Sequence, residues 1–306
     1  MDLGLIISVF LELIKTDRLM KSIVKITFAF LILFSACTPK DTTKADLKQA
    51  LTFHSSFDTD VKADFALGDA NMYTVPNRKV VDSARVGLHK PDITLQEGKG
   101  KYGGGLVFTE RSKGYIYYPS EKNITYNQEN WSGAISFWLS LDPATDLKPG
   151  YCDPIQITDM GYNDAGIWVD FTKANPRDFR LGVIEDRDAW NPNPVGPDNE
   201  NPIFLELLPT VKNPPFAKDK WTHILINFSG LNSESGEASL YLNGELQGTR
   251  SNIKNPFTWE ISKSNIYLGL GYIGLFDELS IFNRNLTDTE IKALYTLENG
   301  VTSILR

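Results

Sequence analysis

The sequence predicts an all-β protein, a two-sheet antiparallel sandwich that ends in a short helix. Many segments alternate apolar and polar residues with a period of two, which is typical of strands with one buried face. Short turns rich in glycine, proline and asparagine separate these segments. Only one segment, next to the C-terminus, carries a helix signature. Together these observations favour a sandwich over an α/β fold.

The composition is that of a globular protein. The chain has 306 residues, of which 42% are hydrophobic and 23% are charged. All-β sandwiches often reach this length as one domain. The formal net charge is −7 and no block of basic residues occurs, so we predict that nucleic acid is not a partner.

Residues 1–37 are predicted to be a signal region for export. Met20 looks like the natural start, and Lys21 and Lys25 give a positive beginning. Residues 26–34 form an apolar stretch that is too short for a comfortable membrane span. A plain secretory signal or a short membrane anchor would show the same pattern.

The end of this region resembles the lipobox of bacterial lipoproteins. Ser35 and Ala36 are the small residues that precede the cysteine in that family, whereas Phe34 departs from the usual leucine. The resemblance implies that Cys37 is lipidated and becomes the mature N-terminus. The lipid would anchor the protein at the outer membrane or cell surface. Residues 38–50 would then be a polar tether.

The folded domain is expected to span residues 51–306. After a first strand, a glycine-rich turn at residues 101–105 leads into a second strand, and residues 113–118 form another. The next strands have apolar faces made of Ile135, Phe137, Leu139 and Leu141, of Ile167, Val169 and Phe171, and of Phe179, Leu181 and Val183. Residues 185–220 are rich in proline, asparagine and aspartate and are predicted to be a long loop with a strand at residues 203–208.

The last third of the chain has the clearest pattern. Residues 221–228 alternate as a strand, and Asn243-Gly244 predicts a type I′ hairpin turn because both central residues must adopt positive φ. Two more strands follow. Thr287 and Glu290 form a capping box for the terminal helix, with Leu286 placed to pack on that helix.

This order of elements resembles the laminin-G-like domains of the concanavalin A-like jelly-roll superfamily. The resemblance rests on the W-T-H strand at 221–223, the L-Y-L-N-G hairpin at 240–244, the F-D-E-L strand at 276–279 and the capped helix at 283–291. It extends from about residue 131 and is thinner between 185 and 220. It implies a jelly roll, but the superfamily includes lectins, adhesion modules, hydrolases and lyases.

Five side chains are candidates for binding a ligand. Trp138, Trp168, Asp170 and Arg180 lie out of phase with the apolar residues of their strands, so they point away from the core. The resemblance implies that sugar would bind on the concave sheet, where aromatic rings stack on pyranose faces and charged groups bind hydroxyls. Trp190, in the long loop, could fold over that face. Alternatively, these residues are scattered over two sheets and packed under loops.

A second candidate is a calcium site. Asp277 is in phase with Leu275 and Leu279, which predicts that its carboxylate points towards the core. A buried carboxylate needs backbone hydrogen-bond donors, a positively charged partner or a metal ion. The resemblance implies a structural Ca²⁺ held by Asp58 and Asp277, with backbone carbonyls completing the shell. The alternative is a turn cap or an ion pair with Arg284.

Catalytic signatures are weak. The E-x-D-x-E strand of the superfamily's glycoside hydrolases does not occur. Gln156 lies in a strand similar to the Gln-Ile-His strand of alginate lyases, but Thr158 replaces the histidine. If the protein did cleave sugar, Asp170, Arg180 and His223 would be the first catalytic candidates.

The leading hypothesis is therefore a non-catalytic carbohydrate-binding protein of the cell envelope, whose partner is an oligo- or polysaccharide. The first alternative is a polysaccharide lyase or glycoside hydrolase of the same fold. The second is an adhesion or protein-interaction module.

Overall fold

A computed structural model describes residues 42–76 and 83–306 of the protein. Residues 43–306 form one compact unit. The signal region, its start at Met20 and the lipidation site at Cys37 lie outside the described residues. None of the helices in the described ranges is long and apolar enough to cross a lipid bilayer.

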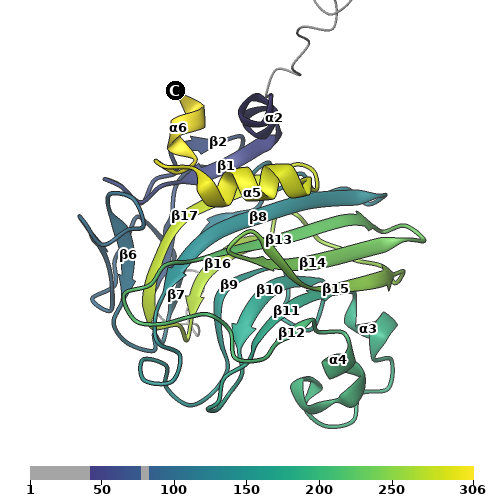
Figure 1. The fold of residues 1–306 in the computed structure, drawn as a ribbon. Helices are drawn as coiled ribbons and strands as arrows, with labels where there is room; N and C mark the ends of the chain where they lie inside the picture. The colour runs from purple at the N-terminus through teal and green to yellow at the C-terminus, as the bar shows by residue number, and fades with distance from the viewer. Residues whose placement is uncertain (1–41, 77–82) are drawn as a thin grey trace, which may run out of the picture. The chain divides into compact units, whose positions relative to one another are not determined.

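Two antiparallel sheets face each other, so the predicted all-β sandwich is confirmed (Figure 1). Counted over the described residues, one sheet has nine strands. Its order is β15 (Glu245–Ile253), β14 (Gly236–Leu242), β13 (Thr222–Leu231), β8 (Trp131–Ser140), β17 (Gly274–Phe282), β1 (Leu51–Ser55) and β2 (Phe65–Ala66), with β6 (Gly105–Phe108) paired to β17 and β5 (Ile93–Gln96) to β6.

The other sheet has eight strands in the described part of the chain. Its order is β12 (Thr210–Val211), β11 (Phe179–Ile184), β10 (Gly166–Phe171), β9 (Cys152–Thr158), β16 (Asn265–Leu270), β7 (Tyr115–Pro119), β3 (Tyr73–Val75) and β4 (Arg85–Val86).

The core lies between the sheets and is made of the predicted inward residues. Phe137 of β8 stacks on Phe276 of β17 with ring centroids 5.1 Å apart. The apolar faces predicted for the strands β8, β10, β11 and β13 all belong to this cluster. The hairpin between β14 and β15 turns at Asn243 and Gly244, which have φ values of 53° and 77°, as the type I′ prediction requires.

Three helices contact the outer face of the nine-stranded sheet or one another. Helix α5 (Asp288–Thr296) begins with the predicted capping box. Helix α2 (Thr43–Ala50) contacts α5 and also α6 (Thr302–Leu305). The prediction of a polar tether over residues 38–50 is therefore wrong for the part within α2. Leu47 and Ala50, three positions apart on that helix, are buried in a shared cluster with Ile291 of α5.

The segment 185–220 is more ordered than predicted. It contains α3 (Arg187–Trp190), a 3₁₀ turn η2 (Asp198–Glu200) and α4 (Pro202–Glu206), followed by β12. The prediction of a strand at residues 203–208 is wrong, because α4 occupies residues 202–206. Asn201 caps α4 by accepting a hydrogen bond from Ile203 N, and Pro202 occupies the first turn.

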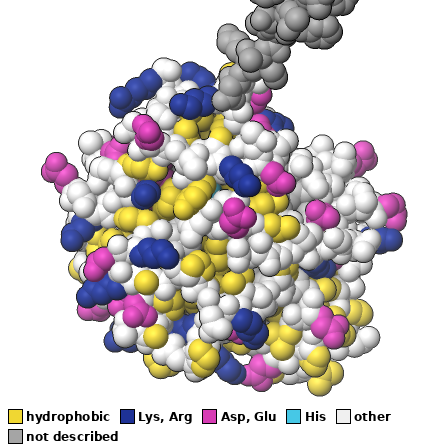
Figure 2. All heavy atoms as spheres, viewed as in Figure 1, with side chains coloured by type: hydrophobic (Ala, Val, Ile, Leu, Met, Phe, Trp, Pro, Cys, Tyr) yellow, Lys and Arg dark blue, Asp and Glu magenta, His cyan; other side chains and the backbone are white. Residues whose placement is uncertain are grey.

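Charges are mixed on the face shown in Figure 2. Lysine and arginine side chains are interspersed there with aspartate and glutamate, and no stripe of one sign runs across it.

Candidate functional site

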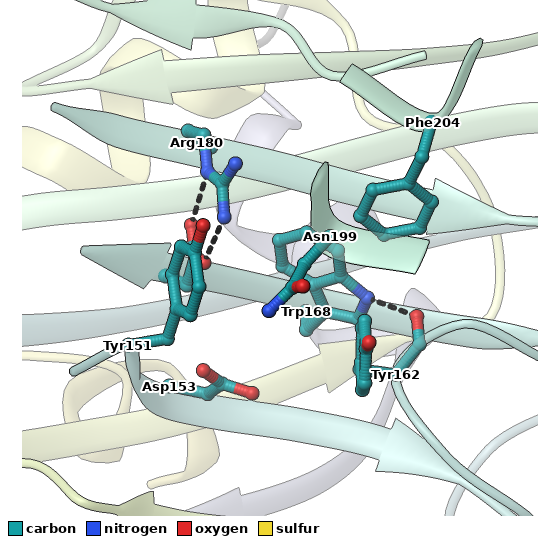
Figure 3. Close-up of a pocket in the computed structure, with 8 residues that line it drawn as sticks. Tyr151, Asp153, Tyr162, Trp168, Arg180, Asn199 and Phe204 are labelled. Atoms are coloured by element: carbon teal, nitrogen blue, oxygen red, sulfur yellow. Dashed lines mark hydrogen bonds and ion pairs between the residues drawn. The ribbon is translucent and has the colours of Figure 1, made fainter. Parts of the chain in front are cut away.

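The alternation of β10 and β11 brings three of the predicted ligand-binding residues together. Asp170 lies directly opposite Arg180, and Trp168 lies directly opposite Gly182. None of the three belongs to the core between the sheets, so they face outward, as predicted. They line a cavity of about 90 Å³, which we call the cross-strand pocket (Figure 3).

A bidentate ion pair forms one wall of the pocket. Arg180 Nε donates to Asp170 Oδ1 at 2.8 Å, and Arg180 Nη2 donates to Asp170 Oδ2 at 2.5 Å. Both side chains are about 95% buried. Burial alone would lower the pKa of Arg180, but its hydrogen bonds to Asp170 outweigh burial and raise the pKa. The two hydrogen bonds therefore hold the side chains of the pair in one geometry.

Trp168 is a buried wall of the pocket rather than an exposed platform. Its ring lies flat over Gly182, where an added Cβ would come within 2.1 Å of Trp168 Cε2. Trp168 Nε1 donates to the carbonyl of Tyr162 at 2.6 Å. The ring of Phe204, from α4, stacks on it with centroids 6.2 Å apart. The expectation that sugar stacks on an open face of Trp168 does not fit this arrangement.

Trp190 lies over the same face, in the cap formed by α3 and α4. Its ring contacts Phe204 at 5.2 Å, and its Nε1 donates to the carbonyl of Asn163 at 2.9 Å. The ring is 6% exposed. Trp190 therefore supports the cap, and Phe204 separates it from Trp168.

Asp198 holds this cap in place. It accepts hydrogen bonds from Arg187 Nε at 2.7 Å, from Asn191 Nδ2 at 2.7 Å and from the amide of Asn163. Burial alone would raise the pKa of Asp198, but these hydrogen bonds lower it below its ordinary value. The loop that carries Asn199 is thereby fixed at the pocket.

Five residues that line the pocket were not predicted from the sequence: Tyr151, Asp153, Tyr162, Asn199 and Phe204. All except Phe204 are half-buried. In Figure 3, the Asn199 amide and the Asp153 carboxylate point into the space between Tyr151 and Trp168. A signal existed for Asp153, which alternates outward beside the buried Cys152. The other four lie in turns or in the cap, where strand alternation gives no orientation.

The charges of the pocket are unequal. Its lining carries two carboxylates, Asp153 and Asp170, against one guanidinium, Arg180. The Tyr151 ring lies 5.0 Å from the Arg180 guanidinium carbon, in a cation–π contact. An anionic ligand would meet an excess of negative charge here.

Trp138 does not belong to this pocket. It lies on the outer face of the nine-stranded sheet, directly opposite His223 and Asp277. Tyr295 of α5 stacks on its ring at 5.8 Å, and Lys101 Nζ lies 4.8 Å from the ring centroid. The alternation correctly predicted that Trp138 points away from the core. Trp138 lies on the other sheet from the cross-strand pocket, however, and α5 covers it there.

His223 is likewise separated from Asp170 and Arg180. Its Nε2 is 2.8 Å from Ser136 Oγ, and its Nδ1 has no hydrogen-bond partner among the described residues. Burial lowers the pKa of His223 to about 3. The three catalytic candidates do not converge, because His223 lies under α5 on the other sheet.

Asp58 and Asp277, the predicted calcium ligands, contact one glycine-rich loop. Asp277 Oδ2 accepts hydrogen bonds from the backbone amides of Lys101 at 2.7 Å and Tyr102 at 3.2 Å. An added Cβ at Gly103 would come within 2.0 Å of Asp58 Oδ1. Oδ1 of each aspartate is buried without a hydrogen-bond partner among the described residues. These unsatisfied oxygens fit a cation that prefers oxygen ligands.

The orientation predicted for Asp277 is wrong. Glu278 has a φ of 58° and interrupts the pairing of β17 with β8, so a bulge changes the phase of the strand. Phe276 and Leu279 face the core, whereas Asp277 faces outward beneath the glycine-rich loop. The alternative ion pair with Arg284 is also wrong, because Arg284 pairs with Glu290 at 2.5 Å.

Burial makes this region unfavourable for negative charge. Burial and then the neighbouring Glu278 raise the pKa of Asp277 to about 9, and burial raises the pKa of Glu278 to about 8. The described residues contain no cluster of three or more His, Cys, Asp or Glu side chains placed to hold a metal ion. A Ca²⁺ ion here would therefore need backbone carbonyls in its shell.

Comparisons with known proteins agree with the fold. The model of a family described as the concanavalin A-like lectin/glucanases superfamily, Laminin_G_3, matches residues 110–292. No curated protein matches the chain in sequence.

Three solved structures illustrate the similarity. Domain 4 of AbnA, a GH43 extracellular arabinanase from Geobacillus stearothermophilus solved with arabinotriose, is 18% identical with a TM-score of 0.49, over 81% of this chain and 98% of that one. The binding domain of botulinum neurotoxin serotype D is 13% identical with a TM-score of 0.49, over 83% and 52%. A mutant of HCR/D is 13% identical with a TM-score of 0.50, over 82% and 53%. The chain thus spans about half the length of the last two, and at such low identity the similarity concerns the fold alone.

Proposed function

This chain belongs to the concanavalin A-like lectin/glucanases superfamily, and we propose that it is a non-catalytic protein that binds neutral oligosaccharides in the cross-strand pocket. The observation that supports this most directly is the lining of that pocket. Within about 90 Å³ it combines the fixed Asp170–Arg180 pair with half-buried tyrosines and an amide. Sugar recognition requires such a mixture of ring faces and hydrogen-bonding groups.

Each wall has a distinct part in binding. Asp153 and Asp170 offer acceptors to sugar hydroxyls, and Asn199 offers both a donor and an acceptor. Tyr151 and Tyr162, which are half-buried, offer ring surface. Because the negative groups outnumber Arg180, neutral sugars are favoured over uronates and sialic acids.

The test is a glycan-array screen with protein purified from cells that express the full chain, followed by mass spectrometry of each bound glycan. Intact glycan would support the proposal, whereas shortened or unsaturated products would favour the lyase or hydrolase alternative. For a glycan that binds, Asp153→Asn and Asn199→Ala should weaken the affinity about tenfold or more, which corresponds to about 1.4 kcal/mol. Asp178→Asn is a matched control, because Asp178 immediately precedes β11 and does not line the pocket. Equal affinity for all three variants would refute this site.

We further propose that Asp58 and Asp277 hold a structural Ca²⁺ ion on the glycine-rich loop. The ion would neutralise buried carboxylates and use their unpaired Oδ1 atoms. At a free concentration one hundred times its Kd, Ca²⁺ would add about 2.7 kcal/mol of stability, which corresponds to a rise in Tm of roughly 5–11 °C. A chelator should abolish this rise in the Tm of the native protein, and it should leave the Tm of the Asp277→Asn variant unchanged. An unchanged Tm, with no metal in the purified protein, would exclude the site.

We also propose that the protein is exported and that a lipid on Cys37 anchors it to a membrane. Its support is the lipobox-like sequence, with Lys21 and Lys25 before an apolar stretch. Cys37→Ser should move the protein from the membrane fraction to the soluble fraction, and intact-mass measurement should lose the lipid. Cys152→Ser is the matched control, because Cys152 is buried in the core. Membrane association that survives Cys37→Ser would contradict the anchor.

A further inference from the structure

A row of side chains leads from the cross-strand pocket across the outer face of the eight-stranded sheet. Trp168 lies directly opposite Gln156, and Gln156 lies opposite Tyr267. Tyr267 in turn lies opposite Tyr117, which lies opposite Tyr73. We call Gln156, Tyr267, Tyr117 and Tyr73 the tyrosine row. It continues the pocket without a gap in register, from β10 to β3.

The row is accessible from outside the sandwich. Its four residues are all half-buried, whereas their strand neighbours Ile116, Tyr118, Ile266 and Leu268 are fully buried in the core. Four strand spacings separate Trp168 from Tyr73, which is about 19 Å at 4.8 Å per strand. Trp168 and the row together therefore extend over five neighbouring strands of the sheet.

The rings of the row support one another. Tyr73 and Tyr117 stack at 5.4 Å with planes 18° apart, and Tyr117 contacts Tyr267 at 5.9 Å. Tyr73 donates its hydroxyl proton to Asp69 at 2.8 Å, and the Tyr267 hydroxyl accepts from Asn265 at 3.2 Å. Such rings offer rigid contact area at low conformational-entropy cost.

The chemistry of the row matches that of the pocket. The row contains phenol hydroxyls and one amide but no lysine or arginine, and the carboxylate at its far end belongs to Asp69. A polyanion would find no cation along it.

The pocket closes one end of the row. Trp168 lies over Gly182 on the next strand, and Phe204 of the cap covers Trp168. A cavity of about 90 Å³ is also small against the roughly 300–1,000 Å³ of typical ligand pockets, so it can enclose only part of a ligand. The remainder of a longer ligand would lie outside the pocket, and the tyrosine row offers it a surface that is in register with Trp168.

We propose that the tyrosine row binds the chain of a neutral polysaccharide whose terminal sugar occupies the cross-strand pocket. This inference rests on the proposed function, since it uses the same pocket as the anchor for the chain end. It adds the residues Gln156, Tyr267, Tyr117 and Tyr73 to the binding surface, and it predicts a preference for long chains over short ones.

The test is calorimetric titration of the purified full chain with gluco-, manno-, xylo- and arabino-oligosaccharides, from disaccharide to hexasaccharide. For the series that binds, affinity should rise about tenfold or more with length. Tyr117→Ala and Tyr267→Ala should each lower hexasaccharide affinity roughly threefold to tenfold and leave disaccharide affinity unchanged. Asn199→Ala, in the pocket, should weaken every length. Tyr241→Ala is the control, because Tyr241 is half-buried on β14 of the other sheet.

The outcomes separate the two proposals. If disaccharide binds in a manner that depends on Asn199 but affinity does not rise with length, the tyrosine row is refuted and the pocket stands. If no oligosaccharide binds, both are refuted. Thermal melting checks that each variant folds, and Tyr73→Ala at β3 serves as a further test of the row should Tyr117→Ala not fold.

Discussion

Replacing Asp170 by asparagine should destabilise the protein by about 3 kcal/mol. Removal of one member of a buried ion pair typically costs about 3–5 kcal/mol, because the remaining charge is left buried without compensation. Arg180 is only 6% exposed and gives two hydrogen bonds to Asp170, at 2.8 Å and 2.5 Å. We expect the lower end of the range, because asparagine still offers one acceptor and Tyr151 keeps its cation–π contact with Arg180.

Urea denaturation and thermal melting would measure this loss. About 3 kcal/mol should lower Tm by roughly 6–12 °C, at 2–4 °C for each kcal/mol. The control is Asp178→Asn, which removes the ion pair of Asp178 with Lys212, a side chain that is 73% exposed. Exposed pairs contribute at most about 1 kcal/mol, so this variant should stay close to the native protein.

The double variant Asp170→Leu/Arg180→Met sharpens the test. Replacing both charges by apolar groups removes the unpaired guanidinium, so the double variant should be more stable than Asp170→Asn alone. The reasoning would be refuted if Asp170→Asn cost no more than Asp178→Asn. It would also be refuted if the double variant were the least stable of the set.

Two further predictions concern packing and pH. Gly182→Ala should lower the free energy of unfolding in urea by about 1–3 kcal/mol, because its Cβ would lie 2.1 Å from Trp168. Gly248→Ala is the control, because the nearest atom to its Cβ would be 3.3 Å away, and it should change the free energy of unfolding by less than about 1 kcal/mol. Equal effects of the two variants would exclude the close packing of Trp168 on Gly182. Burial lowers the pKa of His223 to about 3 and that of His54 to about 4, whereas the unfolded value is about 6.5. The unfolded state therefore binds more protons than the folded state below pH 6.5. The free energy of unfolding is highest above pH 6.5 with respect to these two histidines, and it decreases as pH falls towards 4. His223→Gln should flatten the slope of unfolding free energy against pH in that window, and a slope identical to that of the native protein would contradict the assignment.

Much of the fold follows from local pattern. Alternation placed Ile135, Phe137 and Leu139 in the core, and the Asn243-Gly244 turn has the positive φ values that its sequence demands. These features depend on backbone geometry within a few residues, which is why the sequence alone predicts them. The bulge at Glu278 shows the limit, because one residue with positive φ reversed the face of Asp277 and nothing in the alternation signals it.

The candidate site was predicted in part for the same reason. Period-two alternation put Trp168, Asp170 and Arg180 on one outward face, and the pairing of β10 with β11 then set Asp170 opposite Arg180. Tyr162 and Asn199 were missed, because they reach the pocket from a turn and from the cap. Their positions depend on hydrogen bonds between separate segments, such as those that Asp198 accepts from Asn163, Arg187 and Asn191.

The sequence by itself determined which side chains leave the core, and the tertiary structure decided what they meet outside it. Trp138 and Trp168 follow the same rule of alternation, yet Tyr295 of α5 covers the first and Phe204 of α4 covers the second. A sandwich has two outer faces, and alternation cannot distinguish them, because it reports only the direction of a side chain relative to its own strand. Which face receives a helix, and which keeps a pocket, depends on contacts between segments distant in sequence.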